Sequence, residues 1–185
     1  MGRPRGFDET EVVRSAAELF AQRSYDGISI DDLVTRLGLH RNSLYKTFGS
    51  KRGLYLSALR WSLEHDVAPL IDRMSDAADT PDGLREALDT AVSGSGLDLL
   101  LLAAVEQAPV DGEVAGLVGN AFAALDAALA PAGHPGGADT PPTPIVALTA
   151  LLLGSRIRIR STGSQTTRTA DELRAALVQH LAPRP

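Results

Sequence analysis

Apolar residues recur along the chain at intervals of three and four, the spacing that gathers them on one face of an α-helix. The first such stripe, Val13, Ala16, Ala17 and Phe20, follows Asp8, a residue type that caps helix N-termini. Similar stripes predict helices over about 9–23, 30–37, 41–48, 51–74, 84–92, 97–107, 111–129, 145–158 and 169–181. No segment alternates convincingly as a strand does. The pattern therefore predicts an all-α protein of about nine helices.

Two of the expected helices are short and flank Gly38. Ser29 and Asp32 have the spacing of a capping box at the start of the first helix. Gly38 is the residue type that most easily takes the left-handed conformation that ends a helix. Ser50 is placed to cap the longer helix that follows. These helix start and stop signals predict two short helices joined by a tight turn, followed by a long helix.

One late segment is ambiguous. Residues 156–160 read Arg-Ile-Arg-Ile-Arg, which alternates with a period of two and is also compatible with an edge strand. The preceding pattern is helical, and arginines suit the negative end of a helix dipole. We therefore interpret the run as the end of the helix that begins near 145.

Charge and aromatic residues divide the 185-residue chain into two parts. Residues 1–61 carry a net charge of +3 and seven of the eight aromatic residues, whereas residues 62–185 carry a net charge of −8. We predict an N-terminal domain over 1–50 and a C-terminal helical domain over 51–185, with helix 51–74 linking the two. The acidic overall balance does not exclude a nucleic-acid partner, because only the contacting surface must be positive.

The short helices match a helix-turn-helix, whose second helix enters the DNA major groove. Leu33, Leu37 and Leu44 are expected to face inward, and Arg41, Asn42 and Tyr45 outward as base contacts. The expected backbone contacts are polar or basic: Arg3, Arg5, Ser29, Ser43, Lys46, Thr47, Ser50 and Lys51. The plainer interpretation is a pair of ordinary short helices with a solvated charged face.

Residues 3–61 resemble the N-terminal domain of the TetR (tetracycline-repressor-like) family of bacterial transcription regulators. The resemblance rests on Gly38, the Leu44-Tyr45 pair, Phe48 and Ser50-Lys51 at the family's spacing. Upstream, Ala16, Leu19, Phe20, Gly27, Ser29 and Ile30 also match. His40 departs from the pattern, since the family has Ser or Thr at this N-cap. The resemblance implies that residues 1–50 bind DNA and that 51–185 form a ligand-binding and dimerisation domain.

The resemblance also implies a homodimer and a small-molecule pocket in the C-terminal helices. The expected dimer contacts are apolar residues of the two last helices: Ile145, Leu148, Leu152, Leu173, Leu177 and Leu181. The pocket candidates combine polar groups with apolar neighbours: Trp61, His65, Met74, Leu99, Ala103, Glu106, Gln107, Asn120 and Phe122. For each of these, an ordinary core, cap or surface role is the alternative.

Other classes of function find little support. The chain has no cysteine, its four histidines lack metal-ligand spacing, and phosphate-binding and nucleophile-elbow motifs are missing. We expect no enzyme, no cofactor and no metal, and a cytoplasmic protein without a membrane segment. The expected function is a ligand-responsive regulator, most often a repressor, that binds a pseudo-palindromic double-stranded operator. The alternative is a DNA-binding or protein-interaction module without an inducer.

Overall fold

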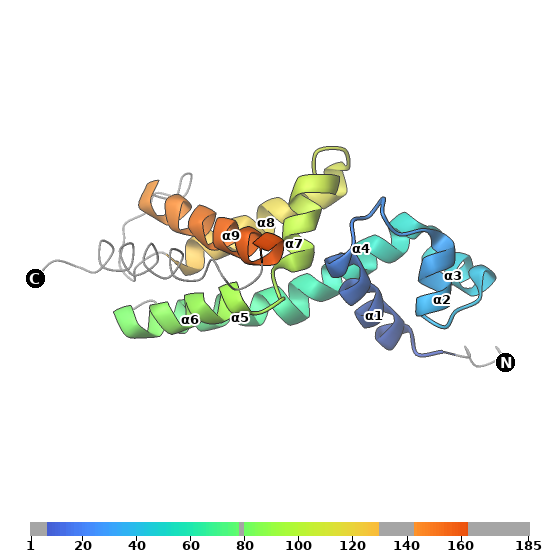
Figure 1. Ribbon diagram of the computed structural model, residues 1–185, viewed down its shortest axis with the longest axis horizontal. Coiled ribbons are helices and arrows are strands. Elements are labelled where there is room, and N and C mark those ends of the chain that lie inside the picture. The colour runs from blue at the N-terminus through green and yellow to red at the C-terminus, as the bar shows by residue number, and fades with distance from the viewer. Residues whose placement is uncertain (1–6, 78–79, 130–142, 163–185) are drawn as a thin grey trace, which may run out of the picture. The chain divides into compact units, whose positions relative to one another are not determined.

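The computed structural model describes residues 7–77, 80–129 and 143–162, and every regular element in these ranges is helical (Figure 1). The elements are α1 (Glu9–Gln22), α2 (Ile30–Arg36), α3 (Arg41–Phe48), α4 (Lys51–Ser62), η1 (Leu63–Val67), α5 (Ala68–Ala77), α6 (Pro81–Ser93), α7 (Asp98–Leu102), η2 (Ala103–Gln107), α8 (Gly112–Ala128) and α9 (Thr143–Thr162). The all-α prediction is confirmed, and the expected helix over 169–181 lies outside the described residues.

These helices belong to two compact units. The first contains residues up to His65 together with Asp98–Val118, and the second contains Asp66–Leu97 and the residues after Val118. The first unit thus joins α1–α4 to α7, η2 and the start of α8. The predicted functional boundary at residue 50 stays a prediction. The two units defined by packing instead bring together residues that are distant in sequence.

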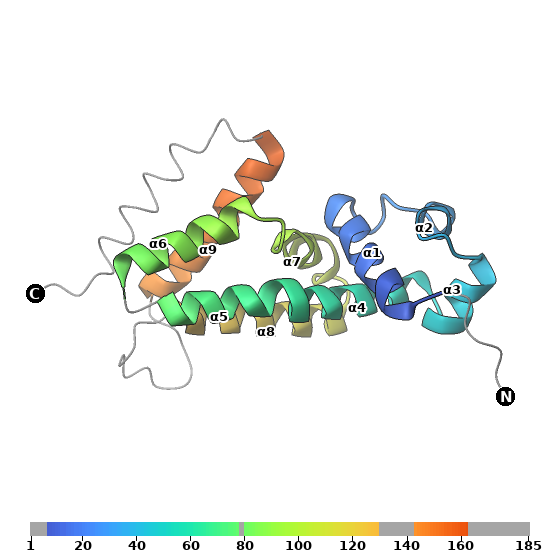
Figure 2. The ribbon, with the colours of Figure 1, turned by 90° about the horizontal axis from the view of Figure 1, so that it is seen from below.

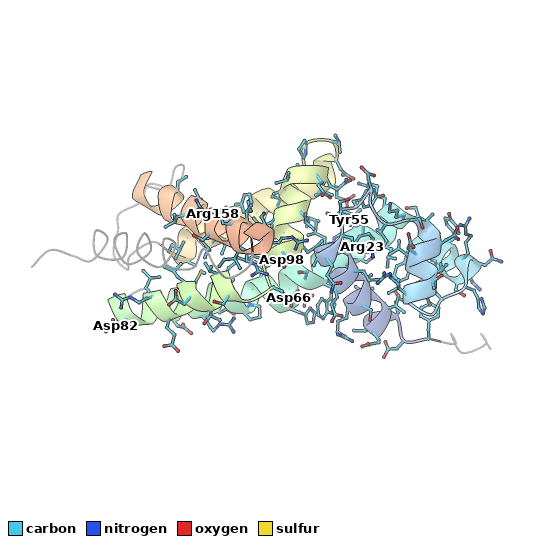
Figure 3. All side chains as sticks on the ribbon, viewed as in Figure 1. Arg23, Tyr55, Asp66, Asp82, Asp98 and Arg158 are labelled. Carbon is cyan, nitrogen blue, oxygen red and sulfur yellow. The ribbon has the colours of Figure 1, made fainter. Side chains whose placement is uncertain are left out.

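The core of the first unit forms where α1 crosses α4. Phe20 of α1 and Leu54 and Leu59 of α4 are buried, and α7 packs against both helices. Tyr55 also lies on α4 beside α1 (Figure 3), with its ring centroid 5.0 Å from that of Phe20. Helix α4 therefore packs against α1, α3 and α7 and is the central helix of this unit.

Helices α2 and α3 contact each other, and α3 contacts α4 (Figure 2). Leu33 of α2 and Leu44 of α3 are fully buried, as predicted, whereas Leu37 is only half-buried. Leu37 was expected to face inward. In the structure it is Leu39, with 8% of its surface exposed, that is buried beside the turn. Gly38 has φ 63°, so the turn between the helices takes the left-handed conformation expected of it.

The predicted helix ends at Asp8, Ser29 and Ser50 are confirmed. The Asp8 carboxylate accepts from the amides of Thr10 and Glu11, and the Ser50 hydroxyl accepts from that of Gly53. Ser29 and Asp32 form a complete capping box. These local contacts set the first residue of α1, α2 and α4.

The helix predicted over 51–74 extends to Ala77 but contains a π-helical turn at Leu63–Val67. The widened turn changes the backbone pairing, and Nδ1 of His65 lies 3.0 Å from the carbonyl oxygen of Trp61. The two rings are stacked, with centroids 4.5 Å apart. A second π-helical turn, Ala103–Gln107, follows α7. Hydrophobic spacing did not indicate either turn.

In the second unit, α6 contacts both α5 and α9. Met74, Leu88 and Leu125 are fully buried. Arg156 of α9 is 8% exposed and donates from Nη1 to the carbonyl oxygen of Val92 at 3.1 Å. Since α9 continues to Thr162, the run 156–160 is helical and the strand alternative is wrong.

No single helix among the described residues is long and apolar enough to cross a membrane. A group of His, Cys, Asp or Glu side chains suited to a metal ion is likewise missing from these residues.

Candidate nucleic-acid interface

The outer face of α3 is polar and exposed. Arg41, Asn42, Tyr45 and Lys46 are exposed on one side of the helix, and Leu44 is fully buried on the other. Tyr45 retains 40% of its surface, a high value for an aromatic side chain in a small helical domain. The three predicted base contacts therefore share one accessible face, together with the basic side chain of Lys46.

The N-terminus of α4 adds an anion-binding feature beside this face. Its first turn holds Lys51 and Arg52 and contains no acidic residue. The exposed backbone amides of a helix start and the positive end of its dipole favour a phosphate group. Nζ of Lys51 lies 4.3 Å from the ring centroid of Tyr25, a cation–π contact that holds the ammonium near this helix start.

The other predicted backbone contacts are placed less uniformly. Ser43 and Thr47 are half-buried on α3, and Ser50 is exposed. Ser29 is exposed, but its amide and hydroxyl both donate to Asp32, and this bonding lowers the pKa of the Asp32 carboxyl. A phosphate at Ser29 would have to compete with that carboxylate. Arg3 and Arg5 lie outside the described residues.

The departure at His40 has the consequence expected from its chemistry. His40 is the N-cap of α3, and its side chain makes no capping hydrogen bond. Helix α3 therefore begins without the side-chain acceptor that Ser29 and Ser50 supply to α2 and α4.

Two sets of long-range contacts join the turn after α1 and helix α4 to the segment 103–113. In the first, the backbone amide of Tyr25 donates to Oε2 of Glu106 at 3.0 Å. Tyr25 also packs edge-on against Tyr55, with centroids 5.0 Å apart, and burial raises the pKa of both tyrosines. The turn after α1 is thereby attached to η2.

In the second set, Arg52 forms a bidentate pair with Asp111, at 2.6 Å from Nε and 2.9 Å from Nη2. Nη2 of Arg52 also lies 2.9 Å from Glu113, which pairs with Arg60 as well. Hydrogen bonding to Arg52 lowers the pKa of Asp111 to about 2. Asp111 also caps α8 through the amides of Glu113 and Val114.

The sequence did not predict the contacts that Tyr25, Arg52 and Asp111 make with distant residues. Each partner lies more than fifty residues away in the chain, and no periodic or local signal links such positions. Glu106 is one of the predicted pocket residues, and in the structure its carboxylate accepts a hydrogen bond from the Tyr25 amide.

The predicted pocket residues are distributed over both units. In the first unit, Leu99 and Ala103 are buried, Trp61, Glu106 and Gln107 are half-buried, and His65 is exposed. In the second unit, Met74 is buried, Phe122 is half-buried and Asn120 is exposed. An open groove of about 270 Å³ between α5 and α6 is lined mainly by charged and small side chains, including Arg73, Asp76, Glu86 and Thr90. It contains none of the candidates, so the ligand pocket stays a prediction.

The predicted dimer contacts need one correction. Leu152 is 1% exposed within its own chain, so its side chain has no surface to offer a partner. The side chains of Ile145 and Leu148 lie outside what the structure describes, as do Leu173, Leu177 and Leu181. The exposed apolar residues of α9 are instead Val146 and Ile157, with 45% and 44% of their surfaces accessible.

Comparison with known proteins agrees with this geometry. Residues 12–58 match the model of the bacterial regulatory proteins, tetR family. The chain is 34% identical to an uncharacterized HTH-type transcriptional regulator, YezE of Bacillus subtilis, over 62% of each chain. It is also 34% identical to the HTH-type transcriptional repressor BdcR of Escherichia coli, over 49% of this chain and 46% of BdcR. The matches thus span about half to three-fifths of these relatives' length.

The fold extends the likeness along the chain. The TetR family transcriptional regulator CifR, solved as a cysteine mutant with 26-bp double-strand operator DNA, superposes with a TM-score of 0.70. That match covers 99% of this chain and all of CifR at 22% identity, which shows a shared fold. In sequence, residues 12–58 are thus similar to the bacterial regulatory proteins, tetR family, and in fold the whole chain is similar to CifR.

Proposed function

We propose that this protein is a transcription regulator that binds duplex DNA by inserting α3 into the major groove. The observation that carries the proposal is the exposed face of Arg41, Asn42 and Tyr45, set opposite the buried Leu44. Arginine pairs with guanine O6 and N7, and asparagine with adenine N6 and N7. The acid-free N-terminus of α4 supplies a neighbouring site for a phosphate. A protein that acts on bacterial chromosomal DNA works in the cytoplasm.

We infer that the regulator acts as a homodimer. A single helix-turn-helix contacts few base pairs, and two copies reading half-sites about 34–36 Å apart give useful specificity. The candidate surface is the stripe Val146, Ala150, Leu153 and Ile157 on α9, which follows the spacing of one helical face. In the corrected interface, this stripe takes the place of Leu152.

We further propose that the protein is a repressor and that a small molecule in the C-terminal helices releases it from its operator. The repressor BdcR among its relatives supports this sign of regulation. A ligand shifts the equilibrium only as far as it binds the non-operator state more tightly. The buried apolar residues Leu99 and Ala103, which lie in the same unit, favour an apolar ligand with few polar groups.

The first experiment is fluorescence anisotropy with duplex DNA from directly upstream of the protein's own gene, at several salt concentrations. Nanomolar binding that is lost with a scrambled duplex supports the proposal. Arg41→Ala should cost ~1–3 kcal/mol and relax the preference at one base pair. Lys51→Ala should weaken binding to all sequences alike and flatten the salt dependence. Arg85→Ala, the same loss of an exposed cation on α6, is the matched control and should leave binding unchanged.

Two results would overturn parts of this proposal. If Arg41→Ala and Lys51→Ala bind like the unchanged protein, the assignment of the DNA-contacting residues is wrong. If neither the upstream DNA nor a selected sequence binds specifically, the helical chain acts instead as a protein-interaction module without an operator.

A further inference from the structure

The first residue of α3 is paired with an acidic residue of the neighbouring helix. Nη2 of Arg41 donates to Oδ1 of Asp31 at 2.5 Å, and the two side chains remain 52% and 77% exposed. An ion pair this exposed contributes little to the stability of a fold, because water screens it and both side chains lose conformational freedom. The stability that Asp31 adds comes from its place in the first turn of α2, where a carboxylate interacts favourably with the helix dipole, and its bond to Arg41 is not needed for that.

Asp31 lies in the first turn of α2, next to Asp32. The two carboxylates have different partners: that of Asp32 belongs to the capping box with Ser29, and that of Asp31 reaches Arg41 across the turn. A carboxylate beside a DNA-reading arginine repels the phosphates of any duplex. Asp31 should thus lower the affinity for every DNA sequence. A lower affinity is compatible with function when the protein discriminates better between its target sequence and others.

The pair also restricts the arginine. A guanidinium group is a planar fork with five N–H donors, so a hydrogen bond to one donor restricts the plane and direction of the others. With Nη2 engaged by Asp31, the neighbouring Nη1 edge remains for the O6 and N7 acceptors of a guanine. The same restriction removes conformations in which Arg41 would reach a phosphate oxygen instead.

From this geometry we propose that Asp31 is a specificity-determining residue: its carboxylate positions the Arg41 guanidinium toward one base pair and keeps it from the phosphate backbone. The inference rests on the proposed function, since it requires that α3 reads DNA. Asp31 acts through Arg41 and is a positioning residue.

The test begins with selection of binding sequences from a randomised duplex pool by the unchanged protein and by Arg41→Ala. The position at which Arg41→Ala loses its base preference is the base pair that Arg41 reads. Dissociation constants are then measured for the best duplex, for the same duplex with that base pair replaced, and for an unrelated duplex. The proteins compared are the unchanged chain, Asp31→Asn, Asp31→Glu, Arg41→Ala and the Asp31→Asn/Arg41→Ala double variant.

Asp31→Asn should bind the unrelated duplex about threefold or more tightly at low salt, because a charge that repels phosphates is removed. Its discrimination at the Arg41 base pair should fall about 3- to 10-fold, less than the roughly 5- to 150-fold that full loss of a bidentate arginine–guanine pair would cost. Asp31→Glu keeps the charge and should retain part of the discrimination. In the Arg41→Ala background, Asp31→Asn should no longer change the base preference.

Asp26→Asn is the matched control, because it removes an exposed carboxylate from the turn between α1 and α2, close in sequence to Asp31. If it lowers discrimination as much as Asp31→Asn, the effect is one of net charge and the inference fails. It also fails if Asp31→Asn leaves discrimination intact, or if its effect persists without Arg41. Loss of all sequence preference in the unchanged protein would instead refute the proposed function. Thermal unfolding of each variant checks that the fold is retained.

Discussion

Replacing Gly53 with alanine tests the packing that holds the recognition helix against α4. Gly53 lies in the first turn of α4, just after the turn that follows α3. A Cβ atom at this position would lie 1.9 Å from the carbonyl oxygen of Phe48, the last residue of α3. Since real Cβ contacts stay beyond 3.0 Å, the two helix ends must separate by about 1.1 Å.

The obstacle is backbone, so no side-chain rotation relieves it. Overpacking of this kind costs ~1–3 kcal/mol. Because the contact is as close as 1.9 Å and involves backbone, the overpacking cost lies at the upper end of that range. Alanine gains at most ~1 kcal/mol over glycine from its helix propensity, so the expected net loss is about 2 kcal/mol. For a chain of this size each kcal/mol lowers the Tm by about 2–4 °C. Because Phe48 ends α3, the displacement also shifts the face of α3 that we propose reads DNA. We expect specific binding to weaken about tenfold, as for loss of one base contact.

Gly116→Ala provides the matched control. Gly116 is an exposed glycine inside α8, and a Cβ there meets nothing within 4 Å. The same substitution at this position should raise the stability by ~0.5–1 kcal/mol. Thermal unfolding and anisotropy with the selected duplex measure both variants. If Gly53→Ala melts at or above the unchanged protein and binds DNA equally well, the close approach to Phe48 does not constrain these helices and the reasoning is refuted.

Three smaller predictions follow from the helix ends. His40→Ser supplies the missing N-cap acceptor of α3 and should add ~0.5–1 kcal/mol of stability, seen as a higher Tm; an unchanged Tm would contradict the capping argument. Gly38→Ala places a Cβ at φ 63° and should cost ~1–2 kcal/mol in urea unfolding, whereas no cost would mean that the turn relaxes. Asp111 has a pKa of about 2 in the fold, below its unfolded value of about 3.9, so its pairing with Arg52 stabilises the fold above about pH 4 and is lost toward pH 2. The Tm difference between the unchanged protein and Asp111→Asn should therefore shrink over that pH interval, and a constant difference would argue against this pair.

The features that the sequence predicted well are those in which cause and effect lie within a few residues. Ser29 caps a helix three residues ahead, and Gly38 adopts the left-handed turn that its own lack of a side chain permits. Leu33 and Leu44 face inward because the helical period places them there. The helix-turn-helix and its outward residues followed from this local chemistry together with the family resemblance.

The features that the sequence did not predict depend on the tertiary arrangement. The partner of Tyr25 is 81 residues away, and that of Arg52 is 59 residues away. By its apolar character alone, Leu152 could be either a dimer contact or a core residue. Only its burial within its own chain, with 1% of its surface exposed, distinguishes the two. The π-helical turns likewise break the regular period without a local signal such as proline or glycine.

The long-range contacts also indicate which part of the chain a ligand could bind in order to change DNA binding. Charge and order along the sequence place the boundary at residue 50, but α7, η2 and the start of α8 pack in the same unit as the DNA-reading helices. Within that unit, Glu106 holds the turn at Tyr25, whose ring contacts Lys51, and Asp111 holds Arg52. Both basic residues lie in the first turn of α4, next to α3. A ligand that favoured another position of the segment 103–111 would therefore directly change the contacts of Lys51 and Arg52 at the start of α4, where we propose that a phosphate binds.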